Sequence, residues 1–336
     1  MSDSFSHLLE NYRNVRTLVL GANGFIGRWV GRLLAQAGSV LTLAVRNPME
    51  AVEIFSAYQV YGHPYQIDLG DFRQVERLIS DVKPAIIFNL AGYGVDPEEC
   101  DEKLAYQINA ELPSTICQIL MDHRDVSWTG QAIVHAGTAA EYGRASGDLN
   151  EKTLPEPFLL YGMSKLKGTL QLKESCEALK LPGLTARLFT VYGPGEHAGR
   201  LFPSLQAVAN SRKPLPLTSG FQKRDFTYVS EVAEGLLRLG LAEPLAGDWV
   251  NLATGKLNTI RDFVGVVARE YAIPRELLIF SAIPTREDEM HHDPVSVRRL
   301  KEWITWKPSM DIKAGVCDTR KFTQPGFRSA CNILSQ

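Results

Sequence analysis

The sequence predicts an α/β protein built on a doubly wound parallel sheet, with a smaller α+β lobe interleaved with it. Short apolar segments alternate with helical patterns through the first half of the chain. These segments are apolar throughout, which is typical of strands that helices cover on both faces of a sheet. Spaced glycines directly follow the first segment, as expected where a strand turns sharply into a helix.

The apolar segments that we expect to be strands recur along the chain. They are residues 16–20, 40–45, 65–68, 85–90, 132–137 and 184–188, with a later strand at 249–251 expected to rejoin the sheet. Helical periodicity is expected from residue 27 to about 37 and over residues 72–82, 105–124 and 161–179. After residue 195 the alternation gives way to prolines, short helices and loops, which indicates a second lobe.

The composition excludes several classes of function. The 336 residues carry a formal charge of −2, which gives no excess of positive charge of the kind that binds nucleic acid. No apolar run approaches the roughly 18 residues of a membrane helix, and residues 1–14 lack the apolar core of a signal peptide. The five cysteines form no Cys-x-x-Cys pair, so we expect a reduced, cytoplasmic chain. His291, His292 and Asp293 are adjacent in a loop, and we expect no metal site there.

The glycine run predicts a dinucleotide site. Gly21, Gly24 and Gly27 are spaced Gly-x-x-Gly-x-x-Gly between a strand and a helix. Glycine permits both the tight turn and the close approach of a pyrophosphate, which then lies on the amides of the helix N-terminus. A plain strand–helix turn is the alternative. The candidate cofactor-binding residues of the turn are Gly21, Asn23, Gly24, Phe25, Ile26 and Gly27.

The end of the second strand favours NADP(H), with NAD(H) as the alternative. An NAD site usually places an acid there, to bond the ribose 2′-hydroxyl. This strand instead ends Val45-Arg46-Asn47-Pro48, without a carboxylate. The guanidinium of Arg46 can pair with a 2′-phosphate through two parallel hydrogen bonds, although a solvated loop arginine is the plainer interpretation. The missing acid favours NADP(H) more strongly than Arg46 does.

A Tyr-x-x-x-Lys pair lies on a predicted helix, at Tyr161 and Lys165. Residues four apart share a helical face, so we expect the lysine charge to lower the pKa of Tyr161 from about 10. Thr138 follows the strand at 132–137, at the sheet edge where ligands bind in such folds. Its hydroxyl can bond a substrate carbonyl while Tyr161 delivers a proton. Each of these residues taken alone could equally have a structural role. Their combination with the glycine run predicts catalysis.

Further motifs accompany these residues along nearly the whole chain. They are Asp68-Leu69, Asn89-Leu90-Ala91-Gly92, Asn109, Arg187-Leu188-Phe189, Tyr192-Gly193-Pro194-Gly195, Arg224-Asp225-Phe226-Thr227-Tyr228-Val229, Asn251-Leu252-Ala253-Thr254-Gly255 and Trp306-Lys307-Pro308. In this combination the chain resembles the extended short-chain dehydrogenase/reductase family. Within that family it is most similar to the nucleotide-sugar epimerase, dehydratase and reductase branch.

The resemblance implies a Rossmann-like fold and a set of residue roles. Tyr161 would be the acid/base, Lys165 would bind the nicotinamide ribose, and Thr138 would orient the reacting hydroxyl or ketone. Asp68 and Leu69 would flank the adenine, and Ala91 would line the cofactor cleft. The remaining cofactor-binding candidates are Leu90, Gly92 and Asn109.

The resemblance also implies a nucleoside-diphosphate sugar as substrate. Arg224, with Arg286, would contact its diphosphate, and guanidinium groups suit that role, although a structural ion pair is the alternative for Arg224. Residues 1–188 with a return segment at 225–257 would form the cofactor domain. Residues 189–224 and 258–336 would form the substrate lobe. A homodimer through the helices at 105–124 and 161–179 is implied as well.

Two alanines narrow the chemistry within the branch. The 4,6-dehydratases carry an Asp-Glu pair directly after the catalytic threonine, but here those positions are Ala139 and Ala140. A methyl group can neither donate nor accept a proton, so 4,6-dehydration is disfavoured. The serine-glutamate pair usual in UDP-glucuronate decarboxylases is missing too.

A 4-ketoreductase is therefore the favoured activity. Arg46 and the Thr138-x-x-Glu141-Tyr142-Gly143 loop, which is similar to that of GDP-4-keto-6-deoxymannose reductases, favour NADPH-dependent reduction of an NDP-4-keto-6-deoxyhexose. An NAD-dependent nucleotide-sugar 4-epimerase is the first alternative. A non-catalytic, dinucleotide-sensing member of the fold is another, since fold does not dictate function. A reductase of a non-nucleotide aldehyde or ketone is the last.

Overall fold

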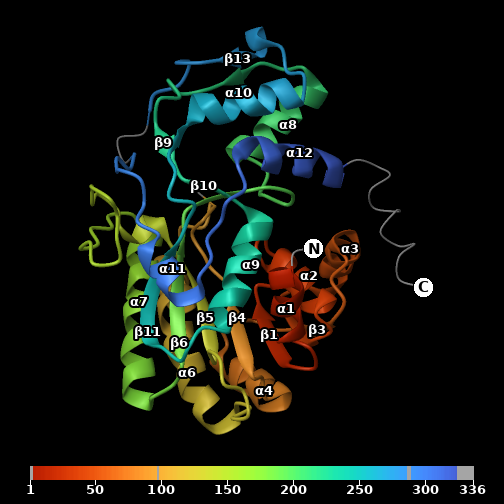
Figure 1. The fold of residues 1–336 in the computed structure, drawn as a ribbon, viewed down its shortest axis with the longest axis vertical. Helices are drawn as coiled ribbons and strands as arrows, with labels where there is room; N and C mark the ends of the chain where they lie inside the picture. The colour runs from red at the N-terminus through yellow and green to blue at the C-terminus, as the bar shows by residue number, and fades with distance from the viewer. Residues whose placement is uncertain (1–2, 97, 286–288, 324–336) are drawn as a thin grey trace.

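A seven-stranded parallel sheet forms the centre of the computed structural model (Figure 1). The structure describes residues 3–96, 98–285 and 289–323. Along the sheet the strands lie in the order β11-β6-β5-β4-β1-β2-β3, so the chain winds outward in both directions from β1. The strands are β1 (Arg16–Leu20), β2 (Val40–Val45), β3 (His63–Gln66), β4 (Ile86–Asn89), β5 (Ile133–Thr138), β6 (Gly183–Leu188) and β11 (Ala246–Leu252).

Helices cover both faces of the sheet, as its apolar strands require. One face carries α1 (Asp3–Glu10), α2 (Gly27–Gln36), α3 (Pro48–Tyr58) and α9 (Val229–Gly240). The other carries α4 (Phe72–Val82), α6 (Leu112–His123) and α7 (Leu160–Leu179). The short helix α5 (Glu102–Tyr106) runs into α6 through a π-helical turn, η1 (Gln107–Glu111). This arrangement confirms the predicted doubly wound fold.

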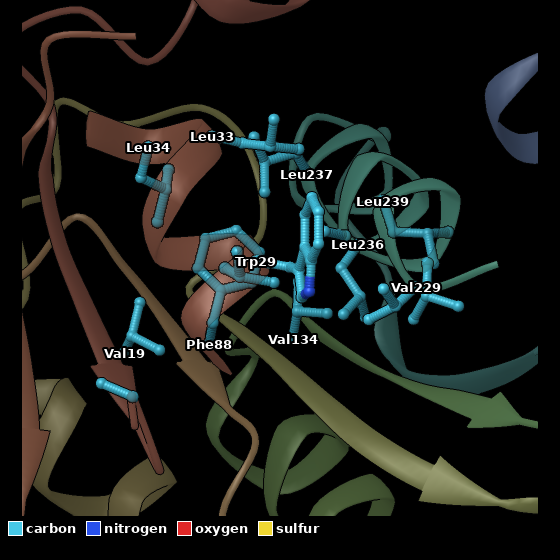
Figure 2. Close-up of a cluster of buried hydrophobic side chains, with 14 of the residues drawn as sticks. Val19, Trp29, Leu33, Leu34, Phe88, Val134, Val229, Leu236, Leu237 and Leu239 are labelled. Atoms are coloured by element: carbon cyan, nitrogen blue, oxygen red, sulfur yellow. The ribbon is translucent and has the colours of Figure 1, made fainter. Parts of the chain in front are cut away.

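Alternation along the strands divides the core between the two faces. On β1, Val19 points to the α2 side, whereas Leu18 and Leu20 point to the α4 side. Figure 2 shows the first side, where Trp29 of α2 lies among Phe88 of β4 and leucines of α9. Full burial of such a side chain contributes about 1.5–3 kcal/mol. The strands thus hold their carboxyl ends, and the residues that follow them, in fixed positions.

The smaller lobe is built from short elements around its own core. Its two-residue or three-residue strands form three pairs. They are β7 (Thr190–Tyr192) with β10 (Phe226–Tyr228), β8 (Leu215–Pro216) with β13 (Leu278–Ile279), and β9 (Lys223–Arg224) with β12 (Asn258–Thr259). Its helices are α8 (Leu201–Ser211), η3 (Arg275–Leu277), α10 (Ile260–Glu270) and α12 (Ile312–Thr323). These elements gather at the top of Figure 1, above the sheet.

The chain crosses between the two parts more than once, as the prediction of an interleaved lobe requires. After β10 it returns to the sheet as α9 and β11, and then leaves again for β12 and α10. The late helix α11 (Arg298–Ile304) packs against β11 and α9, although it lies in the segment expected to form the smaller lobe.

Several elements differ in detail from those predicted. The third strand spans His63–Gln66 instead of residues 65–68, so Asp68 lies beyond its end. The helix expected at 105–124 begins at Glu102 and contains the π turn. Helix α1 was not expected, because residues 1–14 are polar overall. Its Phe5 and Leu8 nevertheless pack on the core, and Tyr12 beyond it donates a 2.6 Å hydrogen bond to Leu237 O.

Among the described residues, no helix combines the length and the apolar character that crossing a bilayer demands.

Candidate active site

Two adjoining cavities open at the carboxyl ends of the strands. The larger, of about 470 Å³, is lined by Thr138, Tyr161 and Lys165 together with Arg224 of the smaller lobe. The second, of about 250 Å³, is lined by the glycine turn, Arg46, Asp68 and Leu69. Both cavities are bordered by Leu90, Ala91 and Gly92. The structure therefore brings most of the predicted site residues to one continuous cleft.

The glycine turn can be formed only by glycine at two positions. Gly21 has a φ of +73°, and a Cβ there would lie 3.0 Å from the backbone of Leu90 and Ala91. A Cβ on Gly27 would collide with the carbonyl oxygen of Gly21. Arg28 braces the turn by donating to Asn23 O at 2.8 Å and to Gly24 O at 3.0 Å.

The rest of the turn divides between the cavities. Gly21, Asn23 and Gly24 line the second cavity, and Phe25 and Ile26 line the larger one. Gly27 is buried behind them and lines neither cavity. The cradle fits a dinucleotide, since its backbone can approach a pyrophosphate without interference from side chains.

Arg46 stands at the far end of the second cavity. Its side chain is exposed and forms no hydrogen bond or ion pair with any residue in the described part of the chain. The Asp68 carboxylate on the same cavity accepts a 2.9 Å hydrogen bond from the Gly70 amide, which fixes its orientation. A guanidinium that has no partner among the described residues and lines the same cavity as the glycine turn is suited to an anionic group of a dinucleotide.

Thr138 is the last residue of β5 and caps the short helix η2 (Ala139–Glu141). Its hydroxyl accepts a 3.2 Å hydrogen bond from the Ala140 amide, and its own amide donates to Glu141 Oε1 at 2.9 Å. This reciprocal pair is a capping box, and it holds the threonine hydroxyl at the wall of the larger cavity. The sequence predicted the edge position but not the cap.

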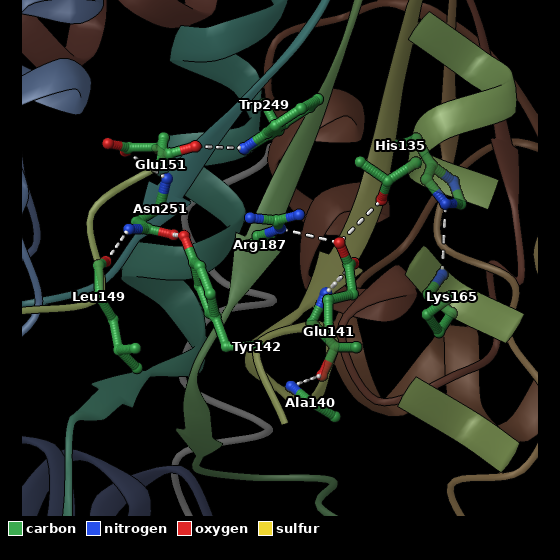
Figure 3. A network of polar contacts seen from close by, with 12 residues as sticks. His135, Ala140, Glu141, Tyr142, Leu149, Glu151, Lys165, Arg187, Trp249 and Asn251 are labelled. Carbon is green, nitrogen blue, oxygen red and sulfur yellow. Dashed lines mark hydrogen bonds and ion pairs between the residues drawn. The ribbon is translucent and has the colours of Figure 1, made fainter. Parts of the chain in front are cut away.

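Beneath Thr138 lies a fully buried ion pair, which Figure 3 shows at the centre of its network. The Glu141 carboxylate accepts from Arg187 Nε of β6 at 2.8 Å and from Thr169 Oγ1 of α7 at 3.0 Å. The Arg187 guanidinium lies over the rings of Tyr142 and Trp249. Glu141 thus joins β6 and α7 to the end of β5, where Thr138 lies.

The expected lowering of the Tyr161 pKa is wrong for the protein without cofactor. Burial raises the pKa of Tyr161 to about 12, against a smaller opposing effect from the Thr138 side chain within hydrogen-bonding range. Burial also lowers the pKa of Lys165 to about 8, while the Glu141 charge opposes that change. At neutral pH the phenol is therefore protonated beside a charged lysine.

Lys165 has a neighbour that the sequence did not indicate. Its Nζ lies 3.3 Å from Nε2 of His135, a fully buried residue of β5. Asn89 of β4 lies 3.1 Å from the other ring nitrogen. No sequence signal marked this contact, because His135 is far from Lys165 along the chain.

Asn109 lies in the π turn, and it lines neither cavity. Its side-chain amide donates to Tyr93 O at 2.7 Å and to Ser164 Oγ at 2.9 Å, and its oxygen accepts from the Tyr93 amide at 3.0 Å. It therefore fastens the loop after β4 to α7 one residue before Lys165. Gly168 makes this approach feasible, since a Cβ there would collide with the Asn109 carbonyl oxygen.

Arg224 enters the larger cavity from the smaller lobe and forms an ion pair with Glu289. Arg224 therefore has the structural ion pair that was the alternative interpretation of this residue, and it also lines the cleft. The next residue, Asp225, accepts hydrogen bonds from the Thr254, Gly255 and Lys256 amides, which anchors the strand that carries Arg224. Arg286 lies outside the described residues.

Sequence reasoning missed two charged residues of the larger cavity, Glu196 and Arg200. Burial raises the pKa of Glu196 to about 8, while the Arg200 charge opposes that change, and one carboxyl oxygen has no hydrogen-bond partner among the described residues. Glu196 directly follows the Tyr192–Gly195 motif, and this position was the only signal available for it. Within the described ranges, no group of three or more His, Cys, Asp or Glu residues could hold a metal ion.

The fold and the cleft define a dinucleotide-dependent oxidoreductase of the α/β class. The sequence model of the NAD dependent epimerase/dehydratase family matches residues 17–253, more than half of the chain. The protein therefore belongs to the NAD dependent epimerase/dehydratase family, which is the extended short-chain dehydrogenase/reductase branch that its motifs indicated. It is accordingly an NAD(P)-dependent enzyme of that type.

Similar proteins include a dehydrogenase and an epimerase that both cover nearly the full length. The dTDP-6-deoxy-L-talose 4-dehydrogenase (NAD(P)(+)) of Kitasatospora kifunensis is 28% identical over 313 residues, spanning 90% of this chain and 93% of the relative. The dTDP-L-rhamnose 4-epimerase of Burkholderia thailandensis is 25% identical over 354 residues, spanning 94% and 96%.

Solved structures share the fold at lower identity. An epimerase from Methanothermobacter thermautotrophicus superposes with a TM-score of 0.81 at 18% identity and covers 95% of both chains. The UDP-glucose 4-epimerase of Thermotoga maritima, solved with UDP-glucose, gives a TM-score of 0.80 at 19% identity, covering 91% of this chain and 97% of the epimerase. These likenesses confirm the architecture of sheet and smaller lobe.

Proposed function

We propose that this enzyme uses NADPH to reduce the C4 ketone of an NDP-4-keto-6-deoxyhexose. The observation that carries the proposal is a complete Thr138, Tyr161 and Lys165 set beside Ala139 and Ala140, which offer no acid or base. Such a set can deliver one proton to the oxygen on the reacting carbon, but Ala139 and Ala140 do not supply the acid–base pair that the 4,6-dehydratases carry at these positions. The talose 4-dehydrogenase relative, by its name, acts at the same carbon of a dTDP-6-deoxy sugar.

The residues have distinct tasks in this reaction. When bound, the cofactor supplies the hydride that C4 receives. Tyr161 donates the proton to the oxygen of the new alkoxide, and a pKa of about 12 keeps its phenol protonated for that step at neutral pH. Thr138, held by its capping box, hydrogen-bonds the same oxygen. Lys165 stabilises the phenolate that remains and offers its other N–H groups to the nicotinamide ribose.

NADPH is proposed over NADH because Arg46 has no partner among the described residues and because β2 ends without an acid. The glycine turn would carry the pyrophosphate, with Asp68 and Leu69 beside the adenine and Leu90, Ala91 and Gly92 along the cleft between them. Asn109 would not touch the cofactor itself. It would act through the loop after β4, which it holds in place. Arg224, with Arg286, would take the diphosphate of the sugar nucleotide, which requires Glu289 to give up its ion pair.

The alternative within the family is an NAD-dependent nucleotide-sugar 4-epimerase, and the rhamnose 4-epimerase relative supports it. An epimerase returns the hydride to the other face of the ketone, so it consumes no cofactor. Co-purification of tightly bound NAD, with interconversion of two sugar epimers, would therefore favour the epimerase over the reductase.

Substitution of Tyr161 by phenylalanine separates catalysis from binding. We expect Tyr161→Phe to lower kcat with NADPH and dTDP-4-keto-6-deoxyglucose or GDP-4-keto-6-deoxymannose by at least about 10²-fold, since general acid catalysis typically contributes 10²–10⁴-fold. The Kd for NADPH, measured by calorimetry, should change by less than about threefold. Retained turnover would exclude Tyr161 as the proton donor. The absence of turnover in the unsubstituted protein, with cofactor binding intact, would favour a dinucleotide sensor.

A further inference from the structure

The buried chain Asn89–His135–Lys165 links the sheet to the catalytic helix. His135 Nε2 lies 3.3 Å from Lys165 Nζ, and Asn89 Nδ2 lies 3.1 Å from His135 Nδ1. All three are almost completely buried, and Lys165 is 2% exposed. Figure 3 shows the His135 ring and the Lys165 side chain directed at one another across β5 and α7.

The contact is chemically demanding, because a buried ammonium needs acceptors. An ammonium has three N–H donors and no acceptor, and this contact is the single hydrogen bond that the Lys165 side chain forms within the described chain. Burial, and secondly the Lys165 charge, hold the pKa of His135 well below its usual range, so the imidazole is neutral. A neutral imidazole accepts through one nitrogen and donates through the other.

We propose that His135 is a positioning residue for Lys165: its neutral ring accepts the ammonium hydrogen bond through Nε2 and holds that charge in the cleft beside Tyr161. The inference deepens the proposed function, from which it takes the role of Lys165. With Nε2 as acceptor, the ring proton lies on Nδ1 and donates to the side-chain oxygen of Asn89. In the structure the amide nitrogen of Asn89 faces Nδ1, and its oxygen has no hydrogen-bond partner among the described residues. The proposed arrangement therefore exchanges the amide nitrogen and oxygen of Asn89, so that the oxygen faces the ring.

The same chain has a second arrangement when Lys165 loses its proton. Asn89 then donates from its amide nitrogen to Nδ1, and the proton on Nε2 donates to the neutral amine of Lys165. The two ring tautomers therefore correspond to the two charge states of the lysine. Since burial lowers the pKa of Lys165 to about 8, the switch should occur as the pH rises through about 8.

The charged groups around the pair set the direction of this pH dependence. Glu141, already paired with Arg187, favours the charged lysine, whereas Tyr161 is neutral below its pKa of about 12. On the neighbouring strands, His135 faces the uncharged Asn89 and Thr185. The other charged residues lining the cavities are Asp68, Glu99, Arg46, Glu196, Arg200 and Arg224. Loss of the lysine charge thus predicts a fall in kcat/KM for reduction above about pH 8.

Glutamine and asparagine at position 135 test the proposal, because their carbonyl oxygens mimic Nε2 and Nδ1 respectively. We expect His135→Gln to keep the alkaline limb of kcat/KM near pH 8. We expect His135→Asn, which leaves Lys165 without an acceptor, to move the limb down by about one pH unit and so to lower kcat/KM about fivefold at pH 8. Thr185→Val, buried on the adjacent strand and with a hydroxyl that has no hydrogen-bond partner in the described chain, should leave the limb in place. Titration of Glu196 would affect kcat/KM equally in the unsubstituted protein and in the three variants, so it does not alter the comparison between them.

A measurement without substrate or cofactor separates this inference from the proposed reaction. Long-range ¹H–¹⁵N NMR of the cofactor-free protein, with His135 assigned by loss of its signals in His135→Gln, should show the Nδ1–H tautomer at pH 6.5 and the Nε2–H tautomer at pH 9.5. A single tautomer across this range, or equal shifts of the alkaline limb in both His135 variants or in neither, would overturn the proposal. The NMR result stands whichever sugar the enzyme reduces.

Discussion

At the scale of single residues, the site combines groups whose identities the sequence could predict with charge states that it could not. Thr138, Tyr161 and Lys165 follow from their positions on a strand end and on one helical face. The pKa of Tyr161 does not, because it depends on how completely the folded chain removes both the phenol and the lysine from water. His135 and Glu196 were missed for the same reason, since only tertiary contacts give them a role.

Arg46 offers the sharpest residue-scale prediction about the cofactor. Hydrogen bonds between charged groups contribute about 1.5–3 kcal/mol, so Arg46→Ala should raise the Kd for NADPH about tenfold to a hundredfold. The Kd for NADH should change less than about twofold, because NADH lacks the 2′-phosphate. Arg13→Ala, an exposed arginine outside both cavities, is the matched control in the same calorimetric titrations. Equal losses for NADPH and NADH would rule out pairing of Arg46 with the phosphate.

At the scale of elements, strands and helices with strong periodicity were predicted almost to the residue. The helix at 72–82 and the strands at 16–20 and 40–45 have the bounds that the structure shows. The exceptions are β3, which was expected at 65–68, helix α3, which was not expected, and two elements that tertiary contacts shape. Helix α1 depends on packing its few apolar residues on the core, and the π turn depends on the close passage of α7 at Gly168. Such contacts leave no periodic signal in the sequence.

The ion pair of Glu141 and Arg187 allows a prediction at this scale, since it joins η2 to β6 and α7. Glu141→Gln leaves a buried guanidinium without its counter-charge, so we expect the free energy of unfolding in urea to fall by about 3–5 kcal/mol. Glu151→Gln is the control: Glu151 is 7% exposed and accepts a hydrogen bond from an amide that glutamine can also accept, so the cost should be about 1 kcal/mol or less. Equal costs would mean that the charge pair adds nothing.

At the scale of the whole molecule, the doubly wound sheet and the interleaved lobe followed from strand–helix alternation and its later loss. The assembly of the lobe was beyond prediction, because its paired strands are only two or three residues long. The predicted division places residues 1–188 and 225–257 on the cofactor side of the cleft, with 189–224 and 258–336 on the substrate side. We retain that division as a proposal, to which α11 is an exception because it packs on the sheet.

We also propose a homodimer through α6 and α7, whose outer faces expose Met121, Met163 and Leu170. Placing a charge in such an apolar contact is costly, so Leu170→Lys should raise the dimer dissociation constant at least about tenfold. Sedimentation over a concentration series would measure it. Leu154→Lys, at a more exposed leucine outside both helices, should leave the dimer intact. A monomeric unsubstituted protein at all concentrations would contradict the proposal.

The destination of the hydride tests the central claim most directly. The enzyme would be incubated with NADPH deuterated on either face of the nicotinamide and with the same two 4-keto-6-deoxy sugar nucleotides. The account predicts that one cofactor face delivers one deuterium to C4 of the product for each NADPH oxidised, as read by mass spectrometry and NMR. Epimerised sugar without deuterium and without loss of NADPH would contradict it.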